Sequence, residues 1–556
     1  MNPTTEPHKK SRKRNVWYSI LTLLLIFLLP YIYFTFFHVP SRVYTRENTG
    51  LERLPPDVEI PMMPDGSRVD YIKAYELIYL RLCEKPEENG WREIVSYMGP
   101  AVFMWNVPSK DSPPMVGRFI PISEMEERTP PKSPPTDEEW KQRMAEFERD
   151  FRPGWEEYCR KLALAPESLS VNKKVTDPEI VEDAICWRLE EKNADEYEFR
   201  KIVSRKLRVT GWNTAEYPEM AVWVAAHEEL LDLAAGAVRQ ERYILPFFRK
   251  DENTYLLATF SDSGDWRFQW TLAVGFCARA TMRLRMEDAD AEKIFADVES
   301  LWRLARHLRL MPQFLINSVG MTIESLAKEL TVRILEENLW NSKQLKTLAS
   351  LLDSLPAPVS QAEIADVNHW TIYEYIDAPS LGESEPDKSL RYLDMGVVAE
   401  RYTELRKGEA AEGAEEHVEN IAKSPVRRFF TALSVRECSK VYADMLASLS
   451  LPQISNVNLI AGRTECFYQL TRLTVFLKCY HSQHGAYPET LDALVPEYFA
   501  QVPVILGVTR PLTYARRGDG FLLAAVRPEF DPEKELTKEE EEEYEDERLF
   551  VVKMPD

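Results

Sequence analysis

The stretch FADVESLWRLARHLRLMPQFLINSVGMTIESLAKEL, residues 295–330, determines the expected fold of the middle of the chain. In its first half, apolar residues recur at intervals of three and four, which predicts a helix whose inward face carries Phe295, Val298, Trp302, Ala305 and Leu308. A second helix begins after Met311-Pro312, and its inward face has the same spacing: Leu315, Val319, Ile323, Leu326 and Leu330. Two such helices joined by a short turn predict an antiparallel helical hairpin.

The same pattern continues on both sides of this hairpin. Three pairs of residues have the spacing of a capping box and predict helix starts: Thr136 with Glu139, Asn341 with Gln344, and Ser360 with Glu363. We expect hairpins packed side by side over residues 206–450, and a tetratricopeptide array is the second choice because no period of about 34 residues is found. The acidic residues of these helices are interpreted as surface residues.

Residues 69–205 predict a separate helical region, which a proline-rich excursion over residues 107–135 interrupts. A later helix begins at Tyr217-Pro218, and His227 lies on its inward face. The second histidine that a zinc-peptidase helix needs four residues further on is absent. We therefore interpret His227 as a core histidine.

The segment VWYSILTLLLIFLLPYIYFTFF, Val16–Phe37, carries no charge and is long enough for a helix that spans a bilayer. Basic residues crowd the tail before it, residues 1–15, so the positive-inside rule places the N-terminus in the cytoplasm. The apolar core is longer than that of a cleavable signal peptide, which predicts an uncleaved signal anchor in a cell inner membrane. A proline-bearing linker, residues 38–68, then leads to the bulk of the chain, which we expect outside the cytoplasm.

Charge and cysteine content limit the classes of function. The chain has 69 basic and 90 acidic residues and a net charge of −21, so nucleic acid is not expected as a partner. Its seven cysteines include no C-x-x-C pair, and we expect buried thiols rather than a disulfide framework. Cys466 and Cys479 are expected on one helix, too far apart to form a bridge.

Residues 459–556 predict a small α+β module. A helix with an apolar stripe ends at Gly485, which is expected to act as its C-cap. Strands are predicted after this helix at residues 511–514, 521–526 and 548–554, and the first two form a hairpin. The acidic segment 531–547 is interpreted as a solvated insertion.

Within this module a long helix is followed by G-x-Y-P-x-x-L-x-x-L, a proline-bearing loop, PLTY and GDGFLL. This order resembles the C-terminal part of the type II secretion major pseudopilins, and a module common in uncharacterised bacterial envelope proteins. The matching residues are Gly485, Tyr487, Pro488, Leu491, Leu494, Pro496, Pro503, Pro511, Leu512, Tyr514, Gly518, Gly520 and Phe521. Ile505-Leu506-Gly507 replaces the usual Asp-Pro-Phe and the prepilin start is absent, so neither calcium binding nor pilus assembly is implied.

Two further groups of residues resemble metal-binding or catalytic sites, but their sequence context favours a structural role. Cys479, His481 and His484 have the composition of zinc ligands, but on a helix their spacing distributes the side chains around the axis. The run SDSGD, Ser261–Asp265, predicts a turn rather than a nucleophile or a metal site.

Together these features predict a mainly α protein with an N-terminal transmembrane helix, a large helical-hairpin body and a small C-terminal pseudopilin-like α+β module. The helical region resembles uncharacterised single-span bacterial envelope proteins through NGWREIVSYMGP, YPEMAVWVAAHEELL and WRLARHLRLMPQFLI. We expect a non-catalytic envelope scaffold or adaptor with envelope proteins as partners, associated with a secretion or envelope assembly. The alternative is an extracytoplasmic enzyme, or a peptide- or lipid-binding protein, with its site in the helical body. The sequence assigns no catalytic, cofactor-binding or metal residues and no cofactor.

Overall fold

The computed structural model describes residues 44–47, 49–64, 66, 68–78, 85–106, 136–150, 152–166, 169, 177–189, 196–246, 265–377, 395–406, 418, 423–424, 435–499, 502, 512–526 and 551–554. The expected tail and anchor (1–37), the proline-rich excursion (107–135), most of the SDSGD turn (261–264) and the acidic segment (531–547) lie outside these residues. Within the described part of the chain, no helix combines the length and the apolar character needed to cross a bilayer.

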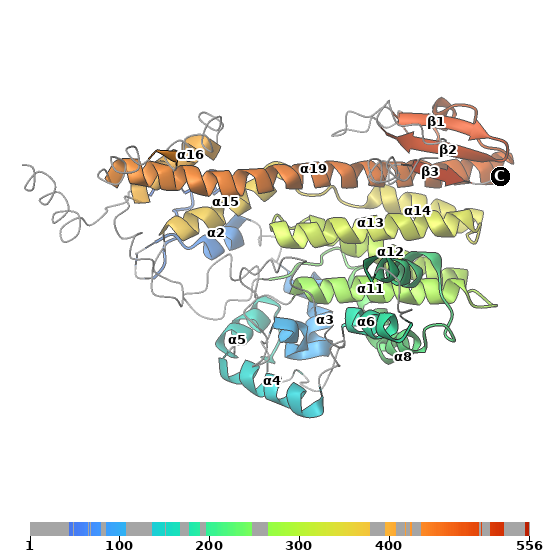
Figure 1. Ribbon diagram of the computed structural model, residues 1–556, viewed down its shortest axis with the longest axis horizontal. Coiled ribbons are helices and arrows are strands. Elements are labelled where there is room, and N and C mark those ends of the chain that lie inside the picture. The colour runs from blue at the N-terminus through green and yellow to red at the C-terminus, as the bar shows by residue number, and fades with distance from the viewer. Residues whose placement is uncertain are drawn as a thin grey trace, which may run out of the picture. The chain divides into compact units, whose positions relative to one another are not determined.

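The chain is mainly helical, with a small antiparallel sheet near its C-terminus, as the sequence predicts (Figure 1). Contacts divide it into two compact units, each made of two sequence segments. Unit 1 comprises residues 1–78 and 368–455, and unit 2 comprises residues 79–367 and 456–556. The ranges expected from sequence for the individual domains remain predictions.

Unit 1 contains α2 (Tyr71–Ile78), α16 (Met395–Arg406) and parts of α15 (Gln361–Asp377) and α19 (Val435–His484). Its core is aromatic. The rings of Tyr373 and Tyr402 meet edge to face, with centroids 5.4 Å apart. The indole N–H of Trp370 donates to the backbone oxygen of Gly50 at 2.7 Å.

Part of the expected linker, residues 38–68, belongs to this core. Leu51 and Leu54 are 0% and 1% exposed. Arg46 donates to the backbone oxygens of Pro55 and Val58, both at 2.7 Å, which holds the proline-bearing stretch in a compact turn. A spacer was expected here because prolines are frequent, yet the two leucines bury enough apolar surface to hold the segment in the unit.

The helices of unit 2 follow one another closely. Their bounds are α3 (Gly90–Met98), α4 (Asp137–Asp150), α5 (Arg152–Lys161), α6 (Pro178–Leu189), α7 (Glu196–Arg205), α8 (Pro218–Ala226), α9 (Glu228–Ala237), α11 (Asp265–Leu284), α12 (Ala291–Arg309), α13 (Phe314–Glu336) and α14 (Ser342–Ser354). The three predicted capping boxes are confirmed. In the box at the start of α14, Asn341 and Gln344 each accept from the other's backbone N–H, at 3.1 Å in both directions.

The predicted inward face of α12 is largely confirmed, since four of its five residues are 0% exposed and Phe295 is half-buried. Leu272, Phe276 and Trp302 are fully buried. On α13 the buried face is shifted, so that Val319 is only half-buried while Glu324 is 0% exposed. Two of the predicted inward residues, Ile323 and Leu330, are 0% exposed, so apolar spacing located the helix and part of its buried face but did not predict the burial of Glu324.

The C-terminal sheet contains β1 (Leu512–Arg517), β2 (Gly520–Ala525) and β3 (Val551–Met554) in the antiparallel order β1-β2-β3. The predicted hairpin and the predicted edge strand are confirmed. Gly518 has a φ of 53°, the positive value that such a short hairpin loop requires. Gly485 has a φ of 74° and its N–H bonds the oxygen of His481 at 2.8 Å, so it ends α19 as predicted.

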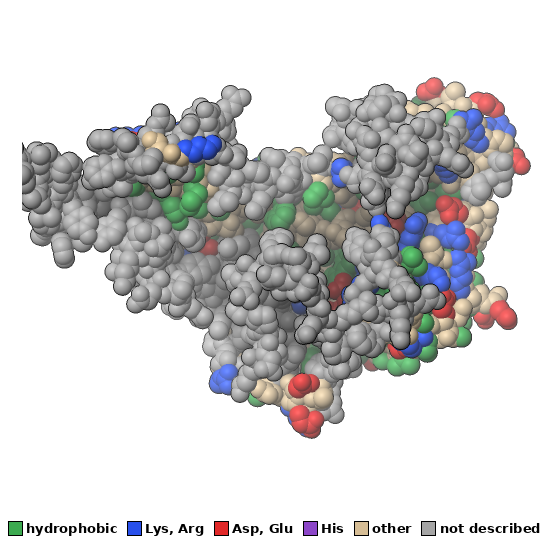
Figure 2. All heavy atoms as spheres, in the orientation of Figure 1, with side chains coloured by type: hydrophobic (Ala, Val, Ile, Leu, Met, Phe, Trp, Pro, Cys, Tyr) green, Lys and Arg blue, Asp and Glu red, His purple; other side chains and the backbone are tan. Residues whose placement is uncertain are grey.

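The space-filling view shows charges of both signs on one face of the molecule (Figure 2). Lys and Arg side chains gather at the right-hand end of this view, and Asp and Glu side chains lie beside them. Neighbouring charges of opposite sign partly cancel, which weakens the field that this end of the face presents to a ligand.

Candidate functional site

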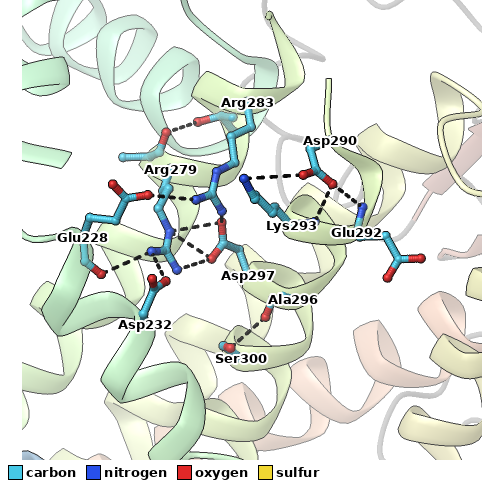
Figure 3. Close-up of polar contacts among 12 residues, drawn as sticks. Glu228, Asp232, Arg279, Arg283, Asp290, Glu292, Lys293, Ala296, Asp297 and Ser300 are labelled. Carbon is cyan, nitrogen blue, oxygen red and sulfur yellow. Dashed lines mark hydrogen bonds and ion pairs between the residues drawn. The ribbon is translucent and has the colours of Figure 1, made fainter. Parts of the chain in front are cut away.

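A cleft of about 460 Å³ lies in unit 2, where α8, α9, α11 and the segment before α12 come together. Charged side chains from three helices meet at this cleft (Figure 3). The charged residues that line it are Glu228, Arg279, Arg283, Asp288, Asp290 and Lys293. We take this cleft as the candidate functional site because it combines charge, depth and exposed apolar surface.

Local helix geometry places its two arginines together. Arg279 and Arg283 are four residues apart on α11, so their side chains share one face. The antiparallel helix α12 brings Asp297 opposite them, and Asp297 is 0% exposed. A carboxylate buried in this way needs cationic partners, and the two arginines supply them.

Asp297 accepts hydrogen bonds from both guanidinium groups. Arg279 donates to its Oδ1 from Nη2 at 2.6 Å and from Nε at 3.1 Å, and Arg283 donates from Nη1 to its Oδ2 at 2.9 Å. From α9, Asp232 accepts from Arg279 at 2.6 Å and Glu228 accepts from Arg283 at 3.4 Å. The cluster thus connects α9, α11 and α12.

Burial and charge act in opposite directions on this cluster. Burial raises the pKa of Asp297, while the charges and hydrogen bonds of Arg279 and Arg283 oppose that increase. Burial also disfavours the charged form of Arg279, but its pKa is raised because Asp297 and Asp232 outweigh the desolvation. The two guanidinium groups therefore favour the carboxylate form of Asp297 against the effect of its burial.

The rim of the cleft contains the N-cap residue of a helix and an exposed apolar side chain. Asp290 is the N-cap of α12 and accepts from the backbone N–H groups of Glu292 and Lys293, and these hydrogen bonds lower its pKa. Met286, which lines the cleft, is 50% exposed, and Val222 on α8 is 70% exposed. Met286 thus adds exposed apolar surface to the cleft, whereas Val222 does not belong to the lining.

The arrangement suits binding better than bond-making chemistry. Asp297 accepts from two arginines, which leaves little capacity for a role as a general base. The lining of the cleft carries equal numbers of basic and acidic side chains. The basic ones are Arg279, Arg283 and Lys293, and the acidic ones are Glu228, Asp288 and Asp290. Across the described residues, no group of three His, Cys, Asp or Glu side chains could hold a metal ion.

A second cluster of two arginines and one buried acid joins the next pair of helices, α12 and α13. Arg306 and Arg309 on α12 donate to Glu324 on α13 at 2.9 and 2.7 Å. As with Arg279 and Asp297, the first arginine and the acid are separated by 18 residues. Each acid was expected at the surface, and this expectation is wrong, because each is 0% exposed and paired with two arginines of the preceding helix.

The structure also places the histidines and cysteines considered from sequence. His227 is a core histidine as predicted: its Nδ1 lies 2.8 Å from the oxygen of Trp223, and burial lowers its pKa. Cys479 is 1% exposed, and burial raises the pKa of its thiol to about 11. His481 and His484 pack against Tyr487 and Tyr480 respectively, so this trio is not gathered around one point.

No family model matches the chain, and no curated protein or solved structure shows significant similarity to it.

Proposed function

We propose that this protein is a non-catalytic scaffold or adaptor of the bacterial envelope. In this proposal Val16–Phe37 anchors it in the inner membrane with the N-terminus in the cytoplasm, and the bulk of the chain lies outside the cytoplasm. Its partners are envelope proteins of a secretion or envelope assembly, and neither a cofactor nor a metal ion is required.

The observation that carries the proposal is the composition of the candidate cleft. Arg279 and Arg283 are paired with Asp297, so these buried charges hold α11 against α12 and are not free to act on a substrate. Met286, in the lining of the cleft, and Val222, on α8 but outside the lining, meanwhile expose apolar surface. Rigid helices with an exposed apolar rim are suited to hold a partner protein.

The C-terminal part of the chain supports the same role. A long helix ending at Gly485 and a following hairpin agree with the order of elements in the pseudopilin-like module. The rings of Tyr487 and Phe521, two residues of that pattern, meet edge to face with centroids 4.8 Å apart. These two matched residues pack on one another, and no chemical function is needed to explain their presence.

Site-specific photocrosslinking of the full-length protein in its native cells tests the proposal. A photoreactive amino acid replaces Val222 or Met286, one position at a time, and crosslinked proteins are identified by mass spectrometry. The matched control position is Lys346, which is exposed on α14. We expect both test positions to capture the same envelope protein and the control position not to capture it.

The double variant Val222→Asp, Met286→Asp should then reduce co-purification of that envelope protein at least about tenfold, because it places charge in an apolar contact. The scaffold role would be contradicted if neither position captured a partner in cells whose membrane fraction contains the protein.

A further inference from the structure

A second cleft, of about 330 Å³, lies in unit 2 between the start of α6, α11 and α13. Its volume is at the small end of the roughly 300–1,000 Å³ typical of ligand pockets. None of its residues belongs to the candidate site described above. It contains two tryptophans, two acids, an arginine and two hydroxyl side chains.

The tryptophans form the apolar part of this cleft. Trp266 and Trp270 are four residues apart on α11 and therefore share one face. The indole N–H of Trp270 donates to Oε1 of Glu179 at 2.8 Å, which fixes the orientation of that ring. The indole N–H of Trp266 is buried and has no hydrogen-bond partner within the described part of the chain. A buried donor without a partner is costly, so a ligand oxygen that reached it would gain a hydrogen bond.

Acceptors and donors are both present around these rings. Asp177 accepts from the backbone N–H of Glu179 at 2.9 Å, and burial is the main cause of its raised pKa. Arg267 also lines the cleft, and Ser318 and Thr322 on α13 add hydroxyl groups. The Thr322 hydroxyl donates to the oxygen of Ser318 at 2.9 Å, so its lone pairs are left to accept.

The charges argue against a strongly ionic ligand. The guanidinium carbon of Arg267 lies 5.1 Å from the centroid of the Trp266 ring, and that of Arg208 lies 5.2 Å from the Trp270 ring. A ligand cation would therefore meet rings that already have cationic neighbours. An anion would meet the carboxylates of Asp177 and Glu179.

We propose that this cleft binds a neutral saccharide. A sugar ring has an apolar C–H face that can pack on an indole, and hydroxyl groups that both donate and accept. The lining supplies that combination: indole surface at Trp266 and Trp270, acceptors and hydroxyl groups from two acids, Ser318 and Thr322, and the unpartnered indole N–H of Trp266 as a donor. Its volume suits one or two sugar rings. Saccharide binding here needs neither the membrane anchor nor a protein partner, so it can succeed or fail separately from the scaffold role.

Calorimetric titration of the full-length protein in detergent tests this site. The probes are cellobiose, maltose, lactose and chitobiose, with choline chloride and inorganic phosphate as charged comparisons. We expect saturable binding of at least one disaccharide and weaker or no binding of both charged probes. Trp270→Ala should weaken the disaccharide at least about tenfold, because an aromatic packing surface is lost.

The variant Trp266→Phe keeps an aromatic ring but removes the N–H, and should weaken the same disaccharide about fivefold through one lost hydrogen bond. Its matched control is Trp340→Phe, because the Trp340 indole N–H is also buried without a partner in the described part of the chain but lies outside this cleft. The control should bind as the wild type does. Asp177→Asn provides a conservative second variant, and thermal melting verifies that each variant is folded.

The proposal is wrong if none of the four disaccharides shows saturable binding, or if choline or phosphate binds more tightly than all of them. It is also wrong if folded Trp266→Phe and Asp177→Asn proteins bind the disaccharide as well as the Trp340→Phe control does.

Discussion

Arg306 on α12 donates from Nη2 to Oε1 of Glu324 on α13 at 2.9 Å, and the two side chains are only 2% and 0% exposed. Arg309 donates to the other carboxylate oxygen at 2.7 Å. The guanidinium carbon of Arg306 also lies 3.8 Å from the ring centroid of Tyr468 on α19. This buried group therefore links α12 to α13 and to the part of α19 that belongs to unit 2.

Glu324→Gln should destabilise the protein by about 3–5 kcal/mol, since it removes the carboxylate between two buried guanidinium groups and leaves Arg306 with only the more distant Glu465, at 3.9 Å. Chemical denaturation of the wild type and the variant measures the difference. The matched control is Glu336→Gln, which removes the partner of Arg333 in a pair that is 31–32% exposed. That change should cost less than about 1 kcal/mol, because a solvated ion pair contributes little. Equal losses in the two variants would show that burial is not what makes the Glu324 contacts important.

His307 should make the protein sensitive to mild acid. Burial is the main cause that lowers its pKa to about 4, and its Nε2 donates to the oxygen of Val238 at 3.0 Å. The unfolded chain binds a proton near a pKa of about 6.5, whereas the folded chain does so only near 4. The stability associated with a neutral His307 is therefore complete above about pH 6.5, and as much as about 3 kcal/mol is lost as the pH falls towards 4.

The variant His307→Gln retains an N–H donor but does not titrate. Between pH 6.5 and 4, its free energy of unfolding should fall less steeply with decreasing pH than that of the wild type. The difference between the two slopes should correspond to at most one bound proton. Other buried histidines, such as His227, contribute equally to both proteins and cancel in the comparison. Parallel curves for the two proteins would mean that His307 is protonated equally easily in the folded and unfolded states.

Gly90 should tolerate no side chain. A Cβ at this position would lie 1.9 Å from the backbone oxygen of Ala237, and the N–H of Gly90 bonds the oxygen of Arg242 at 2.9 Å. Because backbone atoms block the space on one side and a hydrogen bond holds the chain on the other, Gly90→Ala should cost more than about 2 kcal/mol in thermal or chemical denaturation.

Gly236, within α9, provides the matched control, since a Cβ there would meet no heavy atom within 4 Å apart from its chain neighbours and the backbone of its own helix. Gly236→Ala should stabilise the protein by roughly 0.5–1 kcal/mol through helix propensity. Opposite signs for the two alanine variants are the expected result, and a neutral Gly90→Ala would mean that α3 and the end of α9 are not packed as closely as the structure shows.

The uncharged segment Val16–Phe37 should determine membrane attachment. The double variant Leu24→Arg, Leu25→Arg adds roughly 5–7 kcal/mol to the cost of inserting this segment, so the protein should move from the membrane pellet to the soluble fraction. Leu24→Ile, Leu25→Ile is the control and should remain in the pellet after alkaline extraction. Retention of the arginine variant in the pellet would indicate another means of attachment.

Local patterns predicted a large share of the secondary structure. The capping boxes at Thr136, Asn341 and Ser360, the Gly485 helix end and the β1-β2 hairpin all depend on residues close together in sequence, and each is confirmed. Apolar spacing likewise identified α11, α12 and α13 because helix periodicity is a property of the segment itself.

The sequence by itself therefore determined the helical class, the helix starts and the small C-terminal hairpin. Only the tertiary structure decided that Asp297 and Glu324 are core residues, because a carboxylate can be buried only where another helix brings arginines to it. The same holds for the cleft at Trp266 and Trp270, whose acids lie at the start of α6, with Asp177 just before the helix, and whose hydroxyls belong to α13. Periodicity assigns a residue to a face of one helix, whereas a site depends on which faces of several helices meet.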